Sequence, residues 1–551
     1  MPNADSPRPE PYPAHWTTPP AGLTMPDLFG ATMAGHADRV AIRYFDGLLT
    51  WRDVDAESDA LAAALTARGL AAGDRAVLLT QNIPQFAIFV IALWKIGAIP
   101  VPSNPAYREG ELGRLFADCQ PRAILAQTDE VGTARRALDA IGADCLLLVA
   151  DPRDYQTRDD PLIPQGDEPG VDCEMLGELI SGHRGQRPPA FQADPDAIGL
   201  IMYTSGTTGT PRGAMMRQSS LAFNARVFCN LTETGPDDRI FAAAPFFHIT
   251  GMICHLAAAC ASGCSMALPY RLVAGPALEL LREHRPTVTI AAITAFNALM
   301  NAPGAAAADF ASLRHVSSGG APVAPALHEE IRLRTGMEIH IGYGMTETTS
   351  PAVFTPVGAG IPVHPEHGAL SIGIPTPGTE VRVVDEEGRD VPYGAPGELC
   401  MRGPQIMTGY WRKPVETGAV LSADGWLRSG DVAVIDEGGW IYLVDRKKDV
   451  IVASGFKVWP REVEDALHAH PAVREAAVVG APDAYRGETV CAYVSLKPDM
   501  VVRAEELIAH CGQCLTGYKR PRRVEIVDEL PKTVTGKIQR NVLRERARVQ
   551  G

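Results

Sequence analysis

YTSGTTGTPRG occupies residues 203–213 and combines three glycines, five Ser/Thr hydroxyls and one arginine in eleven residues. Glycine lets backbone N–H groups approach an anion closely, and successive N–H groups in such a turn form an anion-binding concavity. Arg212 adds a positive charge. The side chains that can donate hydrogen bonds here are those of Thr204, Ser205, Thr207 and Thr208. The segment predicts a phosphate-binding loop, although an ordinary surface turn uses the same residue types.

The loop does not have the Walker A pattern of P-loop nucleotide hydrolases. That pattern needs a second glycine five residues after the first, followed by Lys and then by Ser or Thr. Counting from Gly206 reaches Pro211, and counting from Gly209 reaches Ala214. A P-loop ATPase is therefore excluded, and the predicted phosphate site belongs to another class of protein.

Length and charge restrict the possible functions. A chain of 551 residues is long enough for two or more domains. The formal net charge of −14 disfavours broad electrostatic attraction to nucleic acid or to an anionic membrane. The longest apolar run, residues 86–94 (FAIFVIALW), is far shorter than a membrane span, so no transmembrane segment is expected. The proline-rich residues 1–23 have no apolar core and predict a frayed arm rather than a signal peptide.

The cysteines indicate a reducing, cytoplasmic environment. There are 11 of them, an odd number scattered along the chain, which does not suit a disulfide framework. Cys511 and Cys514 form an HCGQC motif that is typical of redox pairs and metal sites. Because the surrounding sequence has helical periodicity and no second Cys/His pair is near, we expect two buried thiols on one helix face.

The pattern of elements predicts an α/β fold. Up to residue 195, helix-like stretches alternate with short apolar strands, and the alternation recurs over residues 240–321. This rhythm favours βαβ units around largely parallel sheets. Residues 369–445 have the short strands and turns of a β-rich subdomain, and the whole of residues 24–445 is predicted to form a large N-terminal domain.

A second, smaller domain is predicted at the C-terminal end. Residues 445–449 (DRKKD) form a charged segment between two apolar strands. Residues 446–551 then contain strands and helices sufficient for a compact α+β domain. The position of DRKKD between two self-sufficient units predicts a hinge there.

Four further segments carry candidate chemistry. The Gly-Gly pair of SSGGAP (317–322) would let a flat ring lie against the backbone. In GYGMTETTS (342–350), Glu347 and Thr346 could hold a magnesium ion that also binds phosphate. Asp431 in WLRSGDVA could accept hydrogen bonds from the vicinal hydroxyls of a ribose. Lys537 in PKTVTGK follows a Thr-Gly turn. Each segment taken alone has a purely structural alternative, as a turn, a helix cap or a solvated lysine.

Together and in this order, these motifs, with the DRKKD and SGFKVWPREVE segments, closely resemble the acyl-CoA synthetases of the acyl-adenylate-forming superfamily. The resemblance extends from about residue 49 to residue 540. It implies that residues 203–213 bind the β- and γ-phosphates of ATP, that Glu347 binds Mg²⁺, and that Thr346 contacts the α-phosphate. The cofactor-binding residues that it implies are Thr204, Ser205, Gly206, Thr207, Thr208, Gly209, Arg212, Gly319, Gly320, Ala321, Pro322, Tyr343, Gly344, Asp431, Arg446, Lys448 and Gly455.

The resemblance also assigns individual roles. Gly319, Gly320, Ala321 and Pro322 would line the adenine, Tyr343 would stack on it, and Asp431 and Arg446 would hold the ribose. Two residues depart from the usual family pattern. Arg212 stands where Lys is usual, which keeps the charge but not the donor geometry. Val534 stands where a small or hydroxylated residue is common.

The implied reaction has two steps. A carboxylate attacks the α-phosphate of ATP to give an acyl-adenylate and pyrophosphate, and the thiol of coenzyme A then displaces AMP. Because the first step joins two anions, a cation between them stabilises the transition state, and Lys537 is the candidate. The resemblance further implies that the C-terminal domain rotates about Lys448 between the steps and that Gly455 leaves room for the pantetheine arm.

The carboxylic acid is predicted from short segments only. His248 in PFFHITG matches the position that gates the acyl pocket in relatives, and ITAFNALMNAPG resembles bacterial fatty acyl-CoA synthetases. A medium- or long-chain fatty acid is the first prediction, and a hydroxycinnamate or other aryl acid is the alternative. His248 could equally be a hydrogen-bonded core histidine.

Other classes of protein remain open. A stand-alone peptide-synthetase-like adenylating enzyme would use an acceptor other than CoA, whereas a non-enzymatic nucleotide-binding scaffold would be expected to lack Lys537, Glu347 or Asp431, all of which are present. The expected partners are a small-molecule carboxylic acid and CoA, without nucleic acid, and a homodimer is possible.

Overall fold

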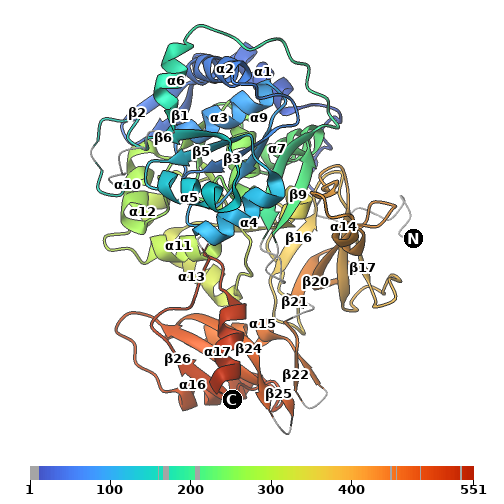
Figure 1. Cartoon of the computed structure of the whole chain (residues 1–551). Coiled ribbons are helices and arrows are strands. Elements are labelled where there is room, and N and C mark those ends of the chain that lie inside the picture. The colour runs from blue at the N-terminus through green and yellow to red at the C-terminus, as the bar shows by residue number, and fades with distance from the viewer. Residues whose placement is uncertain are drawn as a thin grey trace.

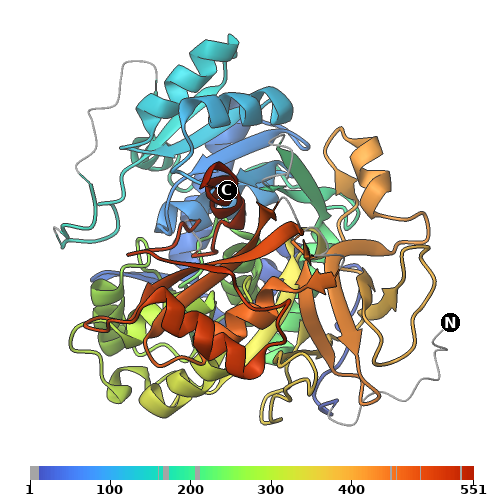
Figure 2. The same cartoon turned by 90° about the horizontal axis from the view of Figure 1, so that it is seen from below.

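The computed structural model describes residues 12–158, 160–164, 173–204, 211–446, 449–453, 456–483, 486–533 and 536–550 of the chain. A large body contains the elements up to residue 446, and a smaller C-terminal unit lies against one side of it (Figure 1). Seen from below, the C-terminal unit lies across the large body (Figure 2).

One part of the large body is a parallel sheet, as the βαβ pattern predicts. Its strand order is β4-β3-β5-β6-β7, and every neighbouring pair is parallel. The strands are β3 (Arg75–Leu79), β4 (Ile99–Pro102), β5 (Ala123–Gln127), β6 (Leu146–Ala150) and β7 (Glu174–Met175). The helices of this region are α1 (Met25–His36), α2 (Trp51–Ala67), α3 (Pro84–Lys95), α4 (Glu109–Cys119), α5 (Val131–Ile141) and α6 (Leu176–Gly182).

Helix starts in this region follow from local sequence. Thr50, in the LTWRDV segment, is the N-cap of α2: its side chain accepts a hydrogen bond from the Asp53 backbone N–H, while the Asp53 carboxylate accepts from the Thr50 N–H. Thr24 and Asp27 form the same capping box at α1. Helix α3 contains the longest apolar run and is buried from residue 84 to residue 94. No helix in the described part of the chain combines the length and apolarity needed to cross a bilayer.

A long mixed sheet forms the rest of the large body. It has the order β17-β18-β20-β21-β16-β15-β14-β13-β12-β10-β11-β1-β2, parallel from β14 through β11 to β1 and antiparallel from β14 to β17. The antiparallel part contains the predicted β-rich region. Its strands are β1 (Val40–Tyr44), β2 (Gly47–Thr50), β10 (Arg239–Phe241), β11 (Ser265–Ala267), β12 (Val288–Ala291), β13 (His315–Gly319), β14 (Ile339–Met345), β15 (Ser350–Phe354), β16 (Ser371–Pro375), β17 (Glu380–Val384), β18 (Gly397–Arg402), β20 (Leu427–Ile435) and β21 (Ile441–Arg446).

A three-stranded sheet carries the ends of the predicted phosphate loop. It consists of β8 (Ile198–Thr204), β9 (Arg212–Arg217) and β19 (Gly409–Tyr410), paired antiparallel. The remaining helices of the large body are α7 (Gln218–Leu231), α8 (Ile249–Gly251), the π-helix η1 (Met252–Ala257), α9 (Ala258–Ser262), α10 (Ala274–His284), α11 (Ile293–Met300), α12 (Ala307–Phe310), α13 (Pro325–Thr335), the 3₁₀ turn η2 (Thr346–Thr348) and α14 (Pro414–Val420).

The C-terminal unit has its own hydrophobic core. A cluster of buried side chains that includes Ile451, Val478 and Val494 lies between its sheet and its helices. The strands are β22 (Ile451–Ala453), β23 (Phe456–Val458), β24 (Val473–Asp483), β25 (Gly487–Leu496) and β26 (Arg523–Ile526), and the helices are α15 (Pro460–His468), α16 (Ala504–Cys514) and α17 (Arg540–Gln550). These elements agree with the α+β pattern read from the sequence. The predicted hinge segment lies between β21 and β22.

Two expectations are corrected here. Helix α16 contains the HCGQC motif as predicted, but only Cys511 is buried; Cys514, at the last helical residue, is exposed. The N-terminal arm is also not frayed over residues 12–23, because Trp16 is 2% exposed and packs with Phe223 of α7 and Phe354 of β15. The prediction of a frayed arm was wrong here because it rested on the polar, proline-rich composition and gave no weight to the one indole side chain.

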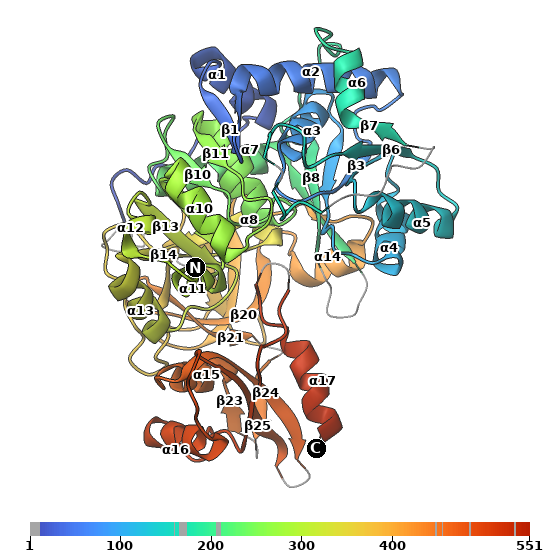
Figure 3. The same ribbon diagram turned by 90° about the vertical axis from the view of Figure 1, so that its left-hand side faces the viewer.

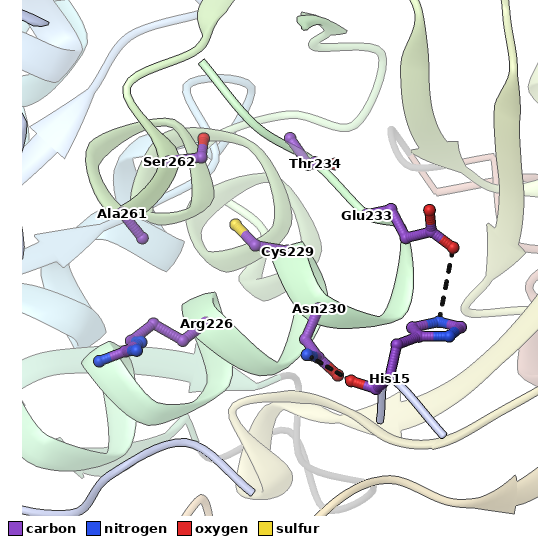
Figure 4. Close-up of a pocket in the computed structure, with 8 residues that line it drawn as sticks. All are labelled: His15, Arg226, Cys229, Asn230, Glu233, Thr234, Ala261 and Ser262. Carbon is purple, nitrogen blue, oxygen red and sulfur yellow. Dashed lines mark hydrogen bonds and ion pairs between the residues drawn. The ribbon is translucent and has the colours of Figure 1, made fainter. Parts of the chain in front are cut away.

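The arm is further fixed to α7 by polar contacts. Asn230 Nδ2 donates to the His15 carbonyl at 2.9 Å, and His15 Nε2 lies 3.6 Å from Glu233 Oε1. These residues border a cavity of about 320 Å³ between the arm, α7 and α9 (Figure 4). None of the residues that line it belongs to the site predicted from the sequence.

Candidate active site

The two ends of the phosphate loop are held together by the β8–β9 pair. Thr204 and Arg212 are cross-strand partners, and Thr204 Oγ1 lies 3.4 Å from the Arg212 carbonyl, to which it donates. Ser205, Gly206, Thr207, Thr208 and Gly209 lie outside the described residues. The Arg212 guanidinium lies over the Tyr410 ring at 5.0 Å, and its buried Nε has no hydrogen-bond partner in the described part of the chain. A buried donor without a partner at a loop of this kind fits an anionic ligand.

Glu347 is buried and already oriented. Its carboxylate lies in the 3₁₀ turn η2, the residue is 5% exposed, and Oε1 accepts a hydrogen bond from the Tyr410 hydroxyl at 2.6 Å. Burial and the neighbouring Glu347 charge raise the pKa of Tyr410, so the phenol stays protonated and keeps donating. Tyr410 therefore joins Arg212 of the phosphate loop to Glu347. The sequence reading missed Tyr410, because GY in MTGYW carries no chemical signature of its own.

The turn after Glu347 is strained. Thr349 and Ser350 have φ of 53° and 81°, which are uncommon for residues with a Cβ. The buried Asn224 amide of α7 stabilises the turn by donating to the Thr349 carbonyl at 2.5 Å and to the Pro351 carbonyl at 3.2 Å. Gly344 approaches the same turn so closely that a Cβ on it would lie 2.0 Å from the Ser350 oxygen. These contacts fix the positions of Thr346 and Glu347, and the sequence reading missed Asn224 as well.

The residues expected to bind the nucleoside lie on neighbouring strands. Gly319 ends β13 and pairs with Gly342 of β14, so SSGGAP and GYGMTETTS are adjacent. Next along β14, the Tyr343 hydroxyl donates to Asp431 Oδ2 at 2.7 Å. The predicted adenine segment continues past β13 with Gly320, Ala321 and Pro322.

Asp431 is placed by the antiparallel part of the long sheet. It lies within strand β20 rather than at a turn cap, and it pairs with Arg446 of β21. The Arg446 side chain is outside the described part, as are Lys448, Gly455 and Val534. The structure thus brings Tyr343 and Asp431 together, and it places the Arg446 backbone beside Asp431.

His248 and Lys537 lie close enough to interact electrostatically, although 289 positions separate them in the chain. His248 caps α8, where its Nδ1 accepts from the Thr250 N–H at 3.3 Å. Burial, and then the nearby Lys537 charge, lower the pKa of His248 to about 4. The imidazole is therefore neutral at pH 7, next to a cation supplied by the C-terminal unit.

Lys537 reaches this place on a turn that docks against the large body. Lys537 N–H donates to Thr533 Oγ1 at 3.1 Å, and the preceding Gly536 carbonyl accepts from Thr294 Oγ1 of α11 at 3.3 Å. Gly536 has φ of 80°, and a Cβ there would lie 2.3 Å from Thr294 Oγ1. The chain leading to α17 extends from the C-terminal unit to the large body (Figure 3). A glycine before Lys537 thus permits both the turn and the close approach.

Comparison with known proteins identifies the class. The model of the AMP-binding enzyme family matches residues 29–411, and that of the AMP-binding enzyme C-terminal domain matches residues 462–537. The chain belongs to this adenylate-forming family. It is more particularly an AMP-forming acid–thiol ligase, that is, an acyl-CoA synthetase.

Individual relatives match over nearly the full length. The chain is 33% identical to a long-chain-fatty-acid–CoA ligase of Escherichia coli O6:H1 (98% of this chain, 97% of the relative) and 34% identical to a feruloyl-CoA synthase of Amycolatopsis sp. (94% and 97%). Among solved structures, the anthranilate CoA ligase AuaEII in complex with anthranoyl-AMP has a TM-score of 0.87 at 27% identity, with 97% of this chain and 98% of that chain covered. The relatives thus differ in the acid that their names specify.

A buried histidine of the large body predicts acid sensitivity. His255 in η1 is fully buried, and burial lowers its pKa to about 4 from an ordinary value of 6.5. Between these values the unfolded chain binds the proton and the folded protein does not, so stability falls as pH falls from 6.5 towards 4. One such histidine lowers the free energy of unfolding by about 2 kcal/mol between pH 7 and pH 5. Urea denaturation at both pH values should show that the free energy of unfolding falls more between pH 7 and pH 5 in the wild type than in His255→Leu.

A second variant separates titration from packing. His255→Phe also removes the titrating group but fills the space differently, so both variants should show the same shallower pH dependence even if their stabilities at pH 7 differ. Parallel pH profiles for the wild type and both variants would contradict the assignment.

Proposed function

We propose that this protein activates a carboxylic acid with ATP through an acyl-adenylate and transfers the acyl group to coenzyme A. The observation that carries this proposal is the position of Lys537. Its segment is docked at Thr294, which follows strand β12, and its charge acts on the pKa of His248. Two strands along the same parallel sheet, β14 carries Tyr343, the partner of Asp431, and leads into Glu347. A nucleotide-binding scaffold without chemistry has no need of a cation delivered by a separate unit.

The site residues suit the charges of this reaction. The carboxylate oxygen attacks the α-phosphorus, and the bond from that phosphorus to the pyrophosphate oxygen breaks. Attack brings an anion to a polyanion, which the Lys537 ammonium and Arg212 offset. In the second step the CoA sulfur attacks the acyl carbon, AMP leaves with the bridging oxygen, and the thiol proton passes to solvent.

Magnesium fits the Glu347 position. The Glu347 carboxylate is buried, and Thr346 precedes it in the chain. The described residues contain no group of three or more His, Cys, Asp or Glu side chains that could hold a metal by themselves. A single carboxylate suits Mg²⁺, which usually keeps several waters and takes its other ligands from substrate phosphates. We propose that Glu347 holds the ion, which would neutralise phosphate charge, and that Tyr410 keeps the carboxylate oriented.

The remaining roles follow the family resemblance. We propose that Ser205 to Gly209 bind the β- and γ-phosphates, that Asp431 and Arg446 hold the ribose, and that residues 319–322 and Tyr343 contact the adenine. We also propose that the two domains meet at a hinge at residues 445–449 and that the C-terminal domain rotates about Lys448. The pantetheine arm of CoA would pass Gly455. A cytoplasmic location and a homodimer also stay predictions.

For the acid, we propose a medium- or long-chain fatty acid. The full-length similarity to long-chain-fatty-acid–CoA ligases supports this choice. An aryl acid is the second candidate, favoured by the similar identity to a feruloyl-CoA synthase and by the fold similarity to the anthranilate CoA ligase.

The role of Lys537 is tested by separating the two half-reactions. Lys537→Ala should lower acid-dependent pyrophosphate release by about 10² or more, the scale seen when one preorganised transition-state donor is lost. Supplied with synthetic acyl-AMP, the variant should still form acyl-CoA at nearly the wild-type rate, because thiolysis does not join two anions.

The matched control is Lys532→Ala. Lys532 lies five positions earlier and pairs with Glu475 of its own domain at 2.8 Å, so its loss should leave adenylation near the wild-type rate. Equal losses in both half-reactions for a folded Lys537→Ala protein would mean that Lys537 is structural.

The acid is tested with a panel assayed for pyrophosphate release with and without CoA. If the acyl site is a fatty-acyl tunnel, KM should fall with chain length beyond hexanoate, because each buried methylene contributes about 0.8 kcal/mol. Release that is stimulated by CoA would identify CoA as the acceptor. Preference for coumarate or benzoate over every aliphatic acid would overturn the fatty-acid proposal in favour of an aryl acid.

A further inference from the structure

The C-terminal unit is held against the large body by contacts in addition to the one at Thr294. Arg461 Nη2 of α15 donates to the Val323 carbonyl at 3.4 Å, a long and weak hydrogen bond. A second contact is made by helix α13, where Glu330 Oε2 accepts a hydrogen bond from Lys497 Nζ at 2.9 Å. Lys497 immediately follows β25, so this ion pair joins the two units.

Glu330 is held in place before Lys497 reaches it. Its other carboxylate oxygen, Oε1, lies 3.3 Å from Arg334 Nη1 one turn along α13. Arg334 in turn donates to Asn301 Oδ1 at 2.9 Å and to the Met300 carbonyl at 3.1 Å, at the end of α11. Because both ends of this chain of contacts lie in the large body, little side-chain entropy remains to be lost when Lys497 docks.

Lys497 is also restricted. Its backbone N–H donates to the Ala472 carbonyl at 2.9 Å. With Leu327 and Glu330 of the large body and His468 of α15, it borders an interface cavity of about 20 Å³. The side chains of Glu330 and Lys497 are 28% and 36% exposed, so the pair is partly shielded from water and salt.

We infer that Glu330 and Lys497 are a positioning pair for adenylation, one that holds the C-terminal unit in the orientation that places Lys537 at the site. Neither side chain touches the reacting atoms. The inference rests on the proposed function for its activity readout, and on the interface geometry for a second, independent readout.

Reversing the charge of either residue of the pair, by Glu330→Lys or by Lys497→Glu, should weaken docking, and the neighbouring charges predict that the two effects differ in size. In Glu330→Lys the new ammonium would face Lys497 with Arg334 and Arg474 close by, so the interface would hold an excess of cations. In Lys497→Glu the new carboxylate would face Glu330, but the same two arginines would offset part of the repulsion. Glu330→Lys should therefore disturb docking more than Lys497→Glu.

The test measures both half-reactions in the two single variants and in the double variant. Acid-dependent pyrophosphate release should fall about 5- to 10-fold in Glu330→Lys and about 3-fold in Lys497→Glu, since reversal replaces a partly shielded attraction by a repulsion. Acyl-CoA formation from supplied acyl-AMP should not fall in any variant. The double variant should recover most of the adenylation rate because the pair is restored with exchanged charges.

A matched control lies on the same helix. Glu329 neighbours Glu330 but binds Arg332 of its own helix, at 2.6 Å and 2.7 Å, and its side chain is 51% exposed. Glu329→Lys changes the charge of α13 and breaks an ion pair to the same extent without touching the interface. It should adenylate at the wild-type rate.

Hydrogen–deuterium exchange supplies the readout that does not depend on activity. In Glu330→Lys, peptides covering residues 323–335 and residues 494–500 should exchange faster than in the wild type, and the double variant should reverse this. If the wild type adenylates no acid of the panel but Glu330→Lys still exchanges faster than the wild type, the result would support the pair and refute the proposed function. Wild-type exchange and wild-type pyrophosphate release in Glu330→Lys, or no recovery in the double variant, would overturn the positioning role.

Discussion

Repulsion between two anions is the constraint on which this structure depends. A carboxylate and the phosphates of ATP must come together, and a permanently placed cation there would also hold back the departing products. In the mechanism proposed above, the chain meets this constraint by carrying the Lys537 ammonium on a second unit with its own core. Gly536 allows the lysine turn to lie against Thr294, and the neutral His248 adds no competing charge beside it.

Contacts within the large body alone fix the geometry around Glu347. The strained turn at Thr349 and Ser350 persists because the buried Asn224 amide satisfies its carbonyls, and Tyr410 orients Glu347. Backbone strain is stored at functional sites only where surrounding contacts over-determine it. The geometry of the predicted metal and phosphate positions is thus set by residues that would themselves touch no substrate.

Much of the fold could be predicted from sequence because its signals are local. Alternation of apolar strands with helical stretches indicates the parallel sheets, and the Thr50 capping box marks the start of α2. The roles of Glu347, Asp431 and Lys537 stay predictions, which rest on the order of the motifs and on the family resemblance, because each motif alone also fits a turn, a helix cap or a solvated lysine. Tyr410, Asn224 and the Glu330–Lys497 pair could not be found in this way. Their partners lie 63, 125 and 167 positions away, and only the tertiary structure brings them together. Trp16 was missed for the same reason.

The most direct test of the central claim follows the oxygen atoms of the acid. A carboxylic acid that the enzyme accepts, labelled with ¹⁸O at both carboxylate oxygens, is incubated with ATP and CoA, and the AMP is analysed by mass spectrometry. If the carboxylate attacks the α-phosphorus and the thiol then attacks the acyl carbon, each AMP carries one ¹⁸O and the thioester keeps the other. Unlabelled AMP, or label recovered in orthophosphate, would contradict an acyl-adenylate intermediate.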